Sequence, residues 1–547
     1  MKRYTKTVLF SLALCLLCGC TGGQQSSSNA ESSDITESSD AAQVTDTTAP
    51  AVSYEAEKLP VISIVTENKD ANVLDFVKEP VAPHVSEAIA SWTPGYVMPP
   101  APYYEACSVT VTDENEQTVL SGVPANVKVR GNWTTVYDKK PLRIQFDEKQ
   151  SMLGMNGGAE LRNWVLLAEY KDASMLRDKT ALYVAREMLE KDGLYAADAK
   201  FAEVYINDQY WGLYLLSEQQ QINSDRVDIT EAEPDYQGTD IGYFMEFDGY
   251  YEYEEPLQQF RVEYADNAAL TPYDGNGGSG REMKCLKQTP ADPKKDIGIT
   301  IKSDIYSQEQ HDFIASYVNN VYQIMYEAAY NDKAFAFNAD YTEIAEDASL
   351  SPQQAVENAV DVQSLADIYL LSELTCDADI YWSSFFMDVD FGAEGSKRLT
   401  FEAPWDFDSG MGNKDRCADG TGFYAANIVP DVDGGTKGGG QYDSINPWLA
   451  VLMYEDWYQD IIRETWTKAY DDGIFERAAD LIAHDTAAYA DAFDENYKKW
   501  DNIRHNESFV NELANEAKWC KTQAEAAEYL EKWFTARVKF MNEQWHK

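Results

Sequence analysis

Two short acidic segments in the second half of the chain carry side chains that are well suited to chemistry. Asp377 and Asp379 follow a stretch with helical character, and Asp406 and Asp408 follow a strand-like stretch. Two predicted strands, at residues 384–387 and 399–401 and joined by a glycine-containing loop, separate these segments, so a hairpin would bring the carboxylates together. Carboxylate oxygens suit a hard cation, and a single carboxylate can act as a general base. An acidic loop that is simply solvated is the alternative interpretation.

Aromatic residues alternate with the carboxylates of the second segment. In the run Trp405-Asp406-Phe407-Asp408, the two rings indicate partial burial of the loop. A partly buried carboxylate needs a cation or hydrogen-bond donors beside it. The residue types alone leave both the chemical and the solvated interpretation open.

The composition excludes several classes of function. The 547 residues include 45 Lys and Arg against 93 Asp and Glu, a formal charge of −48. A chain this acidic is repelled by phosphate backbones, so we expect no nucleic-acid partner. The five His are scattered and never paired at a helical spacing, which argues against a histidine zinc site. The sequence also lacks the short motifs of serine hydrolases, zinc proteases and P-loop proteins.

The elements that must position the acidic segments change in character along the chain. The first half reads as neighbouring antiparallel strands with one embedded helix at residues 174–189 and a hairpin at 201–216. The second half is mostly helical. This order predicts an α+β fold with a strand-rich N-terminal lobe and a helix-rich C-terminal lobe. The predicted strands of the first half cover residues 59–66, 107–112, 126–130, 140–146 and 164–168, and one more strand is expected at 242–247.

The N-terminus predicts export. Residues 1–20 have a basic start and a short apolar core, and they end in a Leu-Cys-Gly-Cys sequence that resembles a bacterial lipobox. Lipid on Cys20 would anchor the protein to the outer face of a bacterial membrane, and an ordinary cleaved signal peptide is the alternative. Residues 21–54 are rich in Ser, Thr and Gln and predict a flexible tether. Residues 55–547 are expected to form the folded domain, with lobes at about 55–220 and 221–547 and a C-terminal helical extension.

Four segments in order resemble the CotH kinase-like family, the spore-coat protein H and its relatives. The WDFDSGMG run at 405–412 is similar to the family's signature. The other similar segments lie at residues 130–144, 164–179 and 203–214, and the resemblance spans about 59–470. It implies an atypical protein-kinase fold that uses ATP and Mg²⁺ or Mn²⁺ to phosphorylate Ser or Thr of a protein substrate.

The resemblance also implies roles for individual residues. Asp379 falls on the catalytic Asp, and Asp406 and Asp408 fall on the metal-binding pair. Lys140 falls on the lysine that holds the ATP phosphates, with Lys139 as its rival.

Three further positions are expected at the site. Arg177 matches an arginine at the start of the family's helix, and Glu218 lies where the two lobes would join, near the adenine. Ser384 occupies the position of a second metal ligand, which is Asn in many members.

Two other functions remain open at this point. Because Ser384 is a weaker metal ligand than Asn, the chain could be a catalytically silent kinase-like binding module at the cell surface. Paired carboxylates together with 13 Trp and 35 Tyr could instead serve a carbohydrate-active enzyme.

Overall fold

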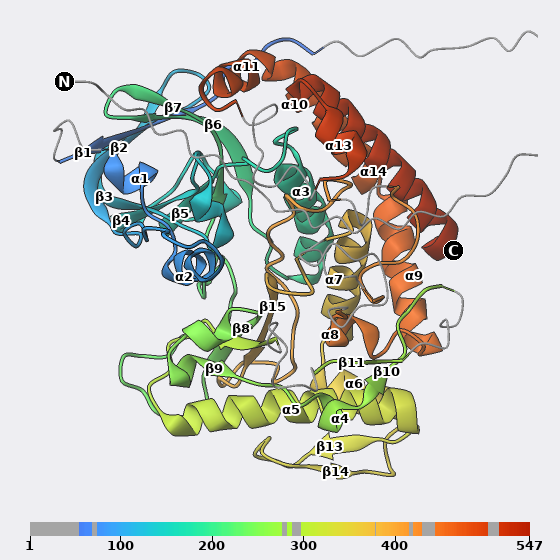
Figure 1. Ribbon diagram of the computed structural model, residues 1–547. Helices are drawn as coiled ribbons and strands as arrows, with labels where there is room; N and C mark the ends of the chain where they lie inside the picture. The colour runs from blue at the N-terminus through green and yellow to red at the C-terminus, as the bar shows by residue number, and fades with distance from the viewer. Residues whose placement is uncertain are drawn as a thin grey trace, which may run out of the picture. The chain divides into compact units, whose positions relative to one another are not determined.

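The structure is a computed structural model that describes residues 54–67, 74–275, 282–286, 297–377, 379–414, 419–428, 444–501 and 513–547. These residues belong to one compact unit, Ser53–Lys547 (Figure 1). The signal peptide, Cys20 and nearly all of the predicted tether lie outside the described residues. The order of the described strands and helices confirms the α+β class.

Seven strands close into a barrel in the order β1, β2, β3, β4, β5, β7, β6. Neighbouring strands are antiparallel except β1 and β6, whose parallel pairing closes the barrel. Alternate residues of β1 are buried, as expected for a strand with one face on a core. The strands are β1 (Val61–Thr66), β2 (Glu105–Thr112), β3 (Thr118–Val129), β4 (Leu142–Gln150), β5 (Leu161–Leu167), β6 (Ala199–Ile206) and β7 (Gln209–Glu218).

The strands and the hairpin predicted for the first half are confirmed. The closure of these strands into a barrel was not predicted. Each predicted strand falls on one of β1 to β5, and β6 and β7 form the predicted hairpin. The parallel β1–β6 pair was not predicted, because it joins segments that lie far apart in the sequence. The predicted helix is α3 (Arg177–Leu189), which starts three residues later than expected.

A second sheet has the order β15, β8, β12, β9 and carries the segment after Asp379. Strand β15 (Phe385–Asp390) pairs along its length with β8 (Gly242–Asp248), the strand expected at 242–247. The predicted partner strand at residues 399–401 is wrong as a strand, because this segment makes only isolated bridges, from Thr400 to Asp388 of β15 and from Leu399 to Val360. The sheet continues with β12 (Gly298–Ile301) and β9 (Gln259–Phe260), and two small hairpins are β10 (Ala269–Leu270) with β11 (Met283–Lys284) and β13 (Phe335–Phe337) with β14 (Ile344–Glu346).

Helices dominate the second half, and side chains cap several of them. Ser307 and Gln310 form a capping box at the start of α5, and Asp361 and Thr522 cap α7 and α14. Within the described residues, no helix is both long and apolar enough to cross a membrane. The helices are α1 (Asp75–Lys78), α2 (Pro83–Trp92), α4 (Tyr264–Asn267), α5 (Gln308–Asn331), α6 (Pro352–Ala359), α7 (Val362–Thr375), α8 (Pro447–Ala450), α9 (Asp456–Asp471), α10 (Ile474–Ala488), α11 (Ala490–Lys499), α13 (Asn515–Trp519) and α14 (Gln523–Trp545).

Two large hydrophobic cores support these elements. One fills the barrel and includes Val127, Ile144 and Trp164. The other joins α3 to the second sheet and the helices, and it also takes in outward-facing barrel residues such as Leu215. Helix α3 thus packs on the outside of the barrel and also on α7 and α10 (Figure 1). The loop before α3 and the loop after α7 are therefore held close to one another.

Candidate active site

The turn after α7 fixes Asp379. Helix α7 ends at Thr375 and is followed by the capping residue Cys376, which has a left-handed backbone conformation. The Asp379 amide donates to Asp377 Oδ1 at 2.9 Å, and the Asp379 carbonyl accepts from the Trp382 and Ser383 amides at 2.7 and 2.9 Å. The Asp379 side chain keeps 24% of its surface exposed. A partly exposed carboxylate on an ordered turn is accessible to a substrate.

The loop that carries Asp406 and Asp408 packs directly on this turn. The Met411 amide donates to the Thr375 carbonyl at 2.6 Å. A Cβ at Gly410 would lie 2.8 Å from that same carbonyl oxygen, so this position requires glycine. Contact between the loop and the end of α7 confirms that the two acidic segments come together.

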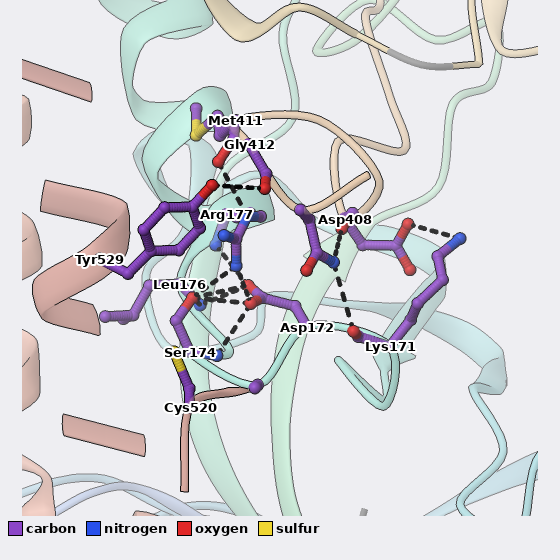
Figure 2. A network of polar contacts seen from close by, with 12 residues as sticks. Lys171, Asp172, Ser174, Leu176, Arg177, Asp408, Met411, Gly412, Cys520 and Tyr529 are labelled. Carbon is purple, nitrogen blue, oxygen red and sulfur yellow. Dashed lines mark hydrogen bonds and ion pairs between the residues drawn. The ribbon is translucent and has the colours of Figure 1, made fainter. Parts of the chain in front are cut away.

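Three basic side chains from separate parts of the chain converge on these acids. Lys171 Nζ lies 3.0 Å from Asp408 Oδ1, and both side chains are almost buried (Figure 2). Lys414 Nζ lies 4.0 Å from Asp379 Oδ1. The Arg130 guanidinium lies over the Trp405 ring, 5.7 Å from its centroid. The site therefore contains carboxylates, which can bind a metal ion, beside cationic side chains, which can bind phosphate.

Negative charge still exceeds positive charge around Asp406. Burial first, and then the charges of Asp408 and Asp379, raise the pKa of Asp406 well above its ordinary value, while Lys171 opposes the shift. Burial lowers the pKa of Arg130 to about 10, even though Asp406 favours its charged form. An additional cation at Asp406 would relieve this imbalance.

Two buried carboxyl groups support the acidic loop from behind. Asp178, in the first turn of α3, accepts the Phe407 amide at 2.6 Å. Burial and the charge of Asp408 raise the pKa of Asp178 to about 7. Burial, followed by the charge of Asp178, also raises the pKa of the buried Glu169 well above its ordinary value. Both shifts favour the neutral form of these carboxyl groups, and this limits the negative charge behind Asp406.

Arg177 connects the start of α3 to the acidic loop. The buried guanidinium forms an ion pair with Asp172 and donates from Nε to the Met411 carbonyl at 3.3 Å (Figure 2). Its contacts are thus with the protein's own loops, and they tie residues 172–177 to residues 408–412.

The two predicted lysines point to backbone carbonyls. Lys140 Nζ donates to the Thr135 carbonyl, and burial lowers its pKa to about 8. Lys139 Nζ donates to the Ala168 carbonyl at 2.8 Å and lies 4.3 Å from the centroid of the Tyr214 ring. Burial lowers the pKa of Lys139 to about 7. The ammonium that pairs with Asp408 is instead Lys171.

The structure places Glu218 in an internal network. Glu218 Oε1 accepts from Asn156 Nδ2 at 2.9 Å and from Arg226 Nε at 3.4 Å, and Oε2 accepts the Asp198 amide at 2.9 Å. Both carboxylate oxygens therefore accept hydrogen bonds that connect the end of β7 to neighbouring segments.

Ser384 is nearly buried beside another acid. Its amide donates to Glu246 Oε1 at 2.9 Å, and Glu246 also forms a 2.6 Å ion pair with Lys302. Ser384 thus lies between the Asp379 turn and β8, and its amide contacts Glu246 of β8.

Sequence reasoning missed Arg130, Lys171 and Lys414 as site residues. Arg130 and Lys171 belong to segments that carried the family resemblance, but residue type and spacing do not show which way a basic side chain points. Lys414 lies two residues after the WDFDSGMG run, which was the one available signal.

Comparison with known proteins agrees with the geometry. The sequence model of a family described as "CotH kinase protein" matches residues 127–541, most of the chain. That range includes Arg130, Lys171, Asp379, Asp406 and Lys414. No curated protein matches the chain. The chain therefore belongs to the CotH kinase protein family.

Proposed function

We propose that the protein is a two-lobed atypical kinase that transfers the γ-phosphate of ATP to Ser or Thr of a protein. The observation that carries this proposal is the convergence of Asp379, Asp406 and Asp408 with Lys171 and Arg130. Phosphoryl transfer needs alignment of the two substrates and neutralisation of charge more than it needs covalent chemistry by the protein. The barrel core and the second core supply the two lobes.

Asp379 is the residue that would accept the proton of the acceptor hydroxyl. Its side chain is partly exposed, ordered by its own turn, and faces Lys414 at 4.0 Å. The acceptor oxygen would bond to the γ-phosphorus as the bond from that phosphorus to the leaving oxygen of ADP breaks. The hydroxyl proton would pass to Asp379, and Lys414 would stabilise the negative charge beside it.

Asp406 and Asp408 fit a divalent cation, Mg²⁺ or Mn²⁺. Within the described parts of the chain, no three Asp, Glu, His or Cys side chains are already assembled around one cation position. Mg²⁺ often binds through only one or two carboxylates and completes its shell with substrate phosphates. Burial, and then the charges of Asp408 and Asp379, raise the pKa of Asp406. A divalent cation at this position would stabilise the charged form of Asp406 and offset the repulsion between these carboxylates. When bound, the ion would neutralise charge on the phosphates.

A row of basic residues continues from Arg130 along the outside of the barrel. Lys128 on β3 and Arg143 on β4 are directly opposite one another in the register of the strands. Arg143 Nη2 donates to Gln219 Oε1 at 2.8 Å, next to Glu218. In a chain with a charge of −48, this row is the surface that would complement a polyphosphate. We therefore assign the phosphate contacts to Lys171 and Arg130 in place of Lys140.

The setting of this activity is part of the proposal. Lipid on Cys20 would hold the kinase at the outer face of a bacterial membrane, where its acceptors would be Ser and Thr of surface or secreted proteins. Ser32, Ser33, Ser38 and Ser39 of the tether are acceptors available in the chain itself.

Binding of nucleotide provides the first test. A thermal-shift titration with ATP and Mg²⁺ or Mn²⁺ should stabilise the protein, by about 2.7 kcal/mol at a hundred times the dissociation constant. Asp406→Asn should lose the metal-dependent part of the shift. The matched control is Asp113→Asn, in an exposed turn of the barrel, which should keep it. An equal shift in Asp406→Asn would remove Asp406 from the site.

A silent binding module is the second candidate, and Ser384 motivates it. A hydroxyl is a weaker metal ligand than the Asn of many family members, so binding could persist without transfer. Metal-dependent ATP binding in a protein that labels neither itself nor an added acceptor would support this candidate. Ser384→Asn should then restore transfer if the missing ligand is the cause.

A further inference from the structure

We propose that helix α14 holds the phosphate-transfer site in register, and that Tyr529 and Gln523 are positioning residues for Lys171, Asp406 and Asp408. The reaction they serve is the proposed phosphotransfer, so the functional side of this inference rests on that proposal. The structural side rests on hydrogen bonds that link α14 to both loops of the site.

The first loop runs from Lys171 to Arg177 and is organised around Asp172. The Asp172 carboxylate accepts the amides of Ser174, Leu176 and Arg177 at 2.8 to 3.0 Å and also pairs with the Arg177 guanidinium (Figure 2). Gln523, the first residue of α14, donates from Nε2 to the Ser174 carbonyl at 2.9 Å. The loop that presents Lys171 is thus tied to the start of α14.

The second loop carries the acids and adopts costly backbone conformations. Asp406, Met411 and Gly412 all have positive φ, at 69°, 45° and 75°. Non-glycine residues in this region cost of order 1–3 kcal/mol unless their surroundings hold them there. The Tyr529 hydroxyl donates to the Gly412 carbonyl at 2.8 Å, next to the Met411 carbonyl that accepts from Arg177 (Figure 2). Helix α14 therefore contacts the loop at Gly412, next to Met411, whose positive φ is costly for a residue with a side chain.

The two loops are also joined to each other, so a constraint on one acts on both. Asn413 Nδ2 donates to the Asp408 carbonyl at 2.7 Å and to the Lys171 carbonyl at 3.3 Å. The Ala514 amide, on the segment before α13, donates to the Asn413 carbonyl at 2.8 Å. The Lys171–Asp408 ion pair is then the far end of a network that begins on α14.

Helix α14 is itself fixed to α7, the helix that leads to Asp379. The Arg537 and Glu373 side chains form a 2.5 Å ion pair, and both are fully buried. Glu373 also accepts the Tyr424 and Ala425 amides at 2.8 and 2.9 Å. Because α14 is anchored to α7, it can hold both loops at a constant position relative to Asp379.

Tyr529→Phe tests the inference, since it deletes one hydroxyl and keeps the ring. Tyr454→Phe is a matched control, because the Tyr454 hydroxyl donates to the Pro272 carbonyl at the same 2.8 Å elsewhere in the protein. Hydrogen–deuterium exchange reads out the loop through the Met411, Asn413 and Lys414 amides, which donate to Thr375, Gly410 and Ser409 carbonyls. Tyr529→Phe should accelerate exchange across residues 406–414 about fivefold, and Tyr454→Phe should leave it unchanged.

A second variant tests the contact of α14 with the other loop, residues 171–177. Gln523→Glu keeps the size of the side chain and replaces its donating amide with an acceptor facing the Ser174 carbonyl. It should accelerate exchange at residues 172–177 and, through Asn413, at 408–414. Unchanged exchange in both variants, or an equal effect of Tyr454→Phe, would overturn the inference.

Activity measurements separate this inference from the proposed function. In an active kinase, Tyr529→Phe should lower kcat about tenfold and change KM for ATP by less than threefold, whereas Tyr454→Phe should change neither. A wild-type protein that transfers no phosphate would refute the kinase proposal, and the exchange comparison would still decide whether α14 holds the loops. An equal kcat in wild type and Tyr529→Phe would refute the positioning role.

Discussion

Replacing Lys171 with Met removes the ammonium that neutralises Asp408 and keeps most of the side chain. The two charged groups are 3.0 Å apart, and their side chains are only 11% and 10% exposed. Removing one partner of a buried ion pair costs about 3–5 kcal/mol, because the remaining charge stays desolvated and unpaired. Asp406, whose pKa is raised by burial and by its acidic neighbours, can take up a proton instead, so we expect a loss near the lower limit, about 3 kcal/mol of unfolding free energy at pH 7.5.

Asp408→Asn should be less harmful, because it leaves Lys171 close to Asp406 and Asp379. The double variant should be more stable than Lys171→Met alone, since it no longer buries an unpaired carboxylate. We expect a coupling free energy of about 1.5–2 kcal/mol between the two substitutions, within the range found for contacting residues.

Urea unfolding followed by circular dichroism measures all four proteins of this cycle. Lys58→Met is the control: its ion pair with Glu116 is 67% and 73% exposed, so its removal should leave the unfolding midpoint unchanged. Strictly additive effects of Lys171→Met and Asp408→Asn, or a Lys171→Met protein as stable as wild type, would refute the reasoning about a buried pair.

Three further predictions concern nucleotide contacts, pH and the acidic loop. Arg130→Met should weaken metal-dependent ATP binding at least tenfold by calorimetry, while Lys140→Met should change it less than twofold; a stronger effect of Lys140→Met would return the phosphate role to that residue. Burial, and then Asp192, raise the pKa of Asp367 to about 8. Because the unfolded carboxyl has a pKa of about 4, the native state binds the extra proton between these values, so this contribution to stability is present at low pH and is lost as pH rises to 8. Asp367→Asn should therefore reduce the fall in thermal midpoint between pH 5 and pH 8, and an unchanged slope would contradict the assignment. Gly412→Ala would place a Cβ 2.5 Å from the Trp533 side chain, on a backbone with a φ of 75°. This substitution should therefore lower the unfolding free energy by about 2–4 kcal/mol in the same urea assay. Gly95→Ala is the control and should cost less, because a Cβ at Gly95 would have no neighbouring atom within 4 Å.

The sequence was sufficient for the local elements and for the acidic half of the site. Alternating apolar residues predict β1 to β7, because a strand buries every second side chain in one core. The meeting of Asp379 with Asp406 and Asp408 was also predictable, since the connecting segment is short enough to fold back. The predicted strand at 399–401 was wrong, because this segment meets β15 only at the Asp388–Thr400 bridge. The strand that pairs with β15 along its length is β8, which is more than 130 residues earlier in the chain.

The basic half of the site depends on contacts that sequence patterns do not encode. Lys139 and Lys140 are adjacent, yet both bond to backbone carbonyls, because the barrel and the helices behind it surround them. Lys171 precedes Asp172, whose carboxylate organises the loop into the shape that aims Lys171 at Asp408. Tyr529 lies 117 positions from Gly412, and its spacing in α14 resembles that of any residue packed on a helix face.

Transfer of phosphate is the most direct test of the central claim. The purified protein should be incubated with ATP labelled at the γ-phosphate and Mg²⁺ or Mn²⁺, alone and with a Ser/Thr-containing surface protein, beside Asp379→Asn and Asp406→Asn. We expect metal-dependent labelling on Ser or Thr by the wild type, and a loss of at least 100-fold in both variants, in line with removal of a general base or a metal ligand. Labelling that persists in Asp379→Asn and Asp406→Asn, or a wild type that neither binds ATP with metal nor transfers its phosphate, would contradict that claim.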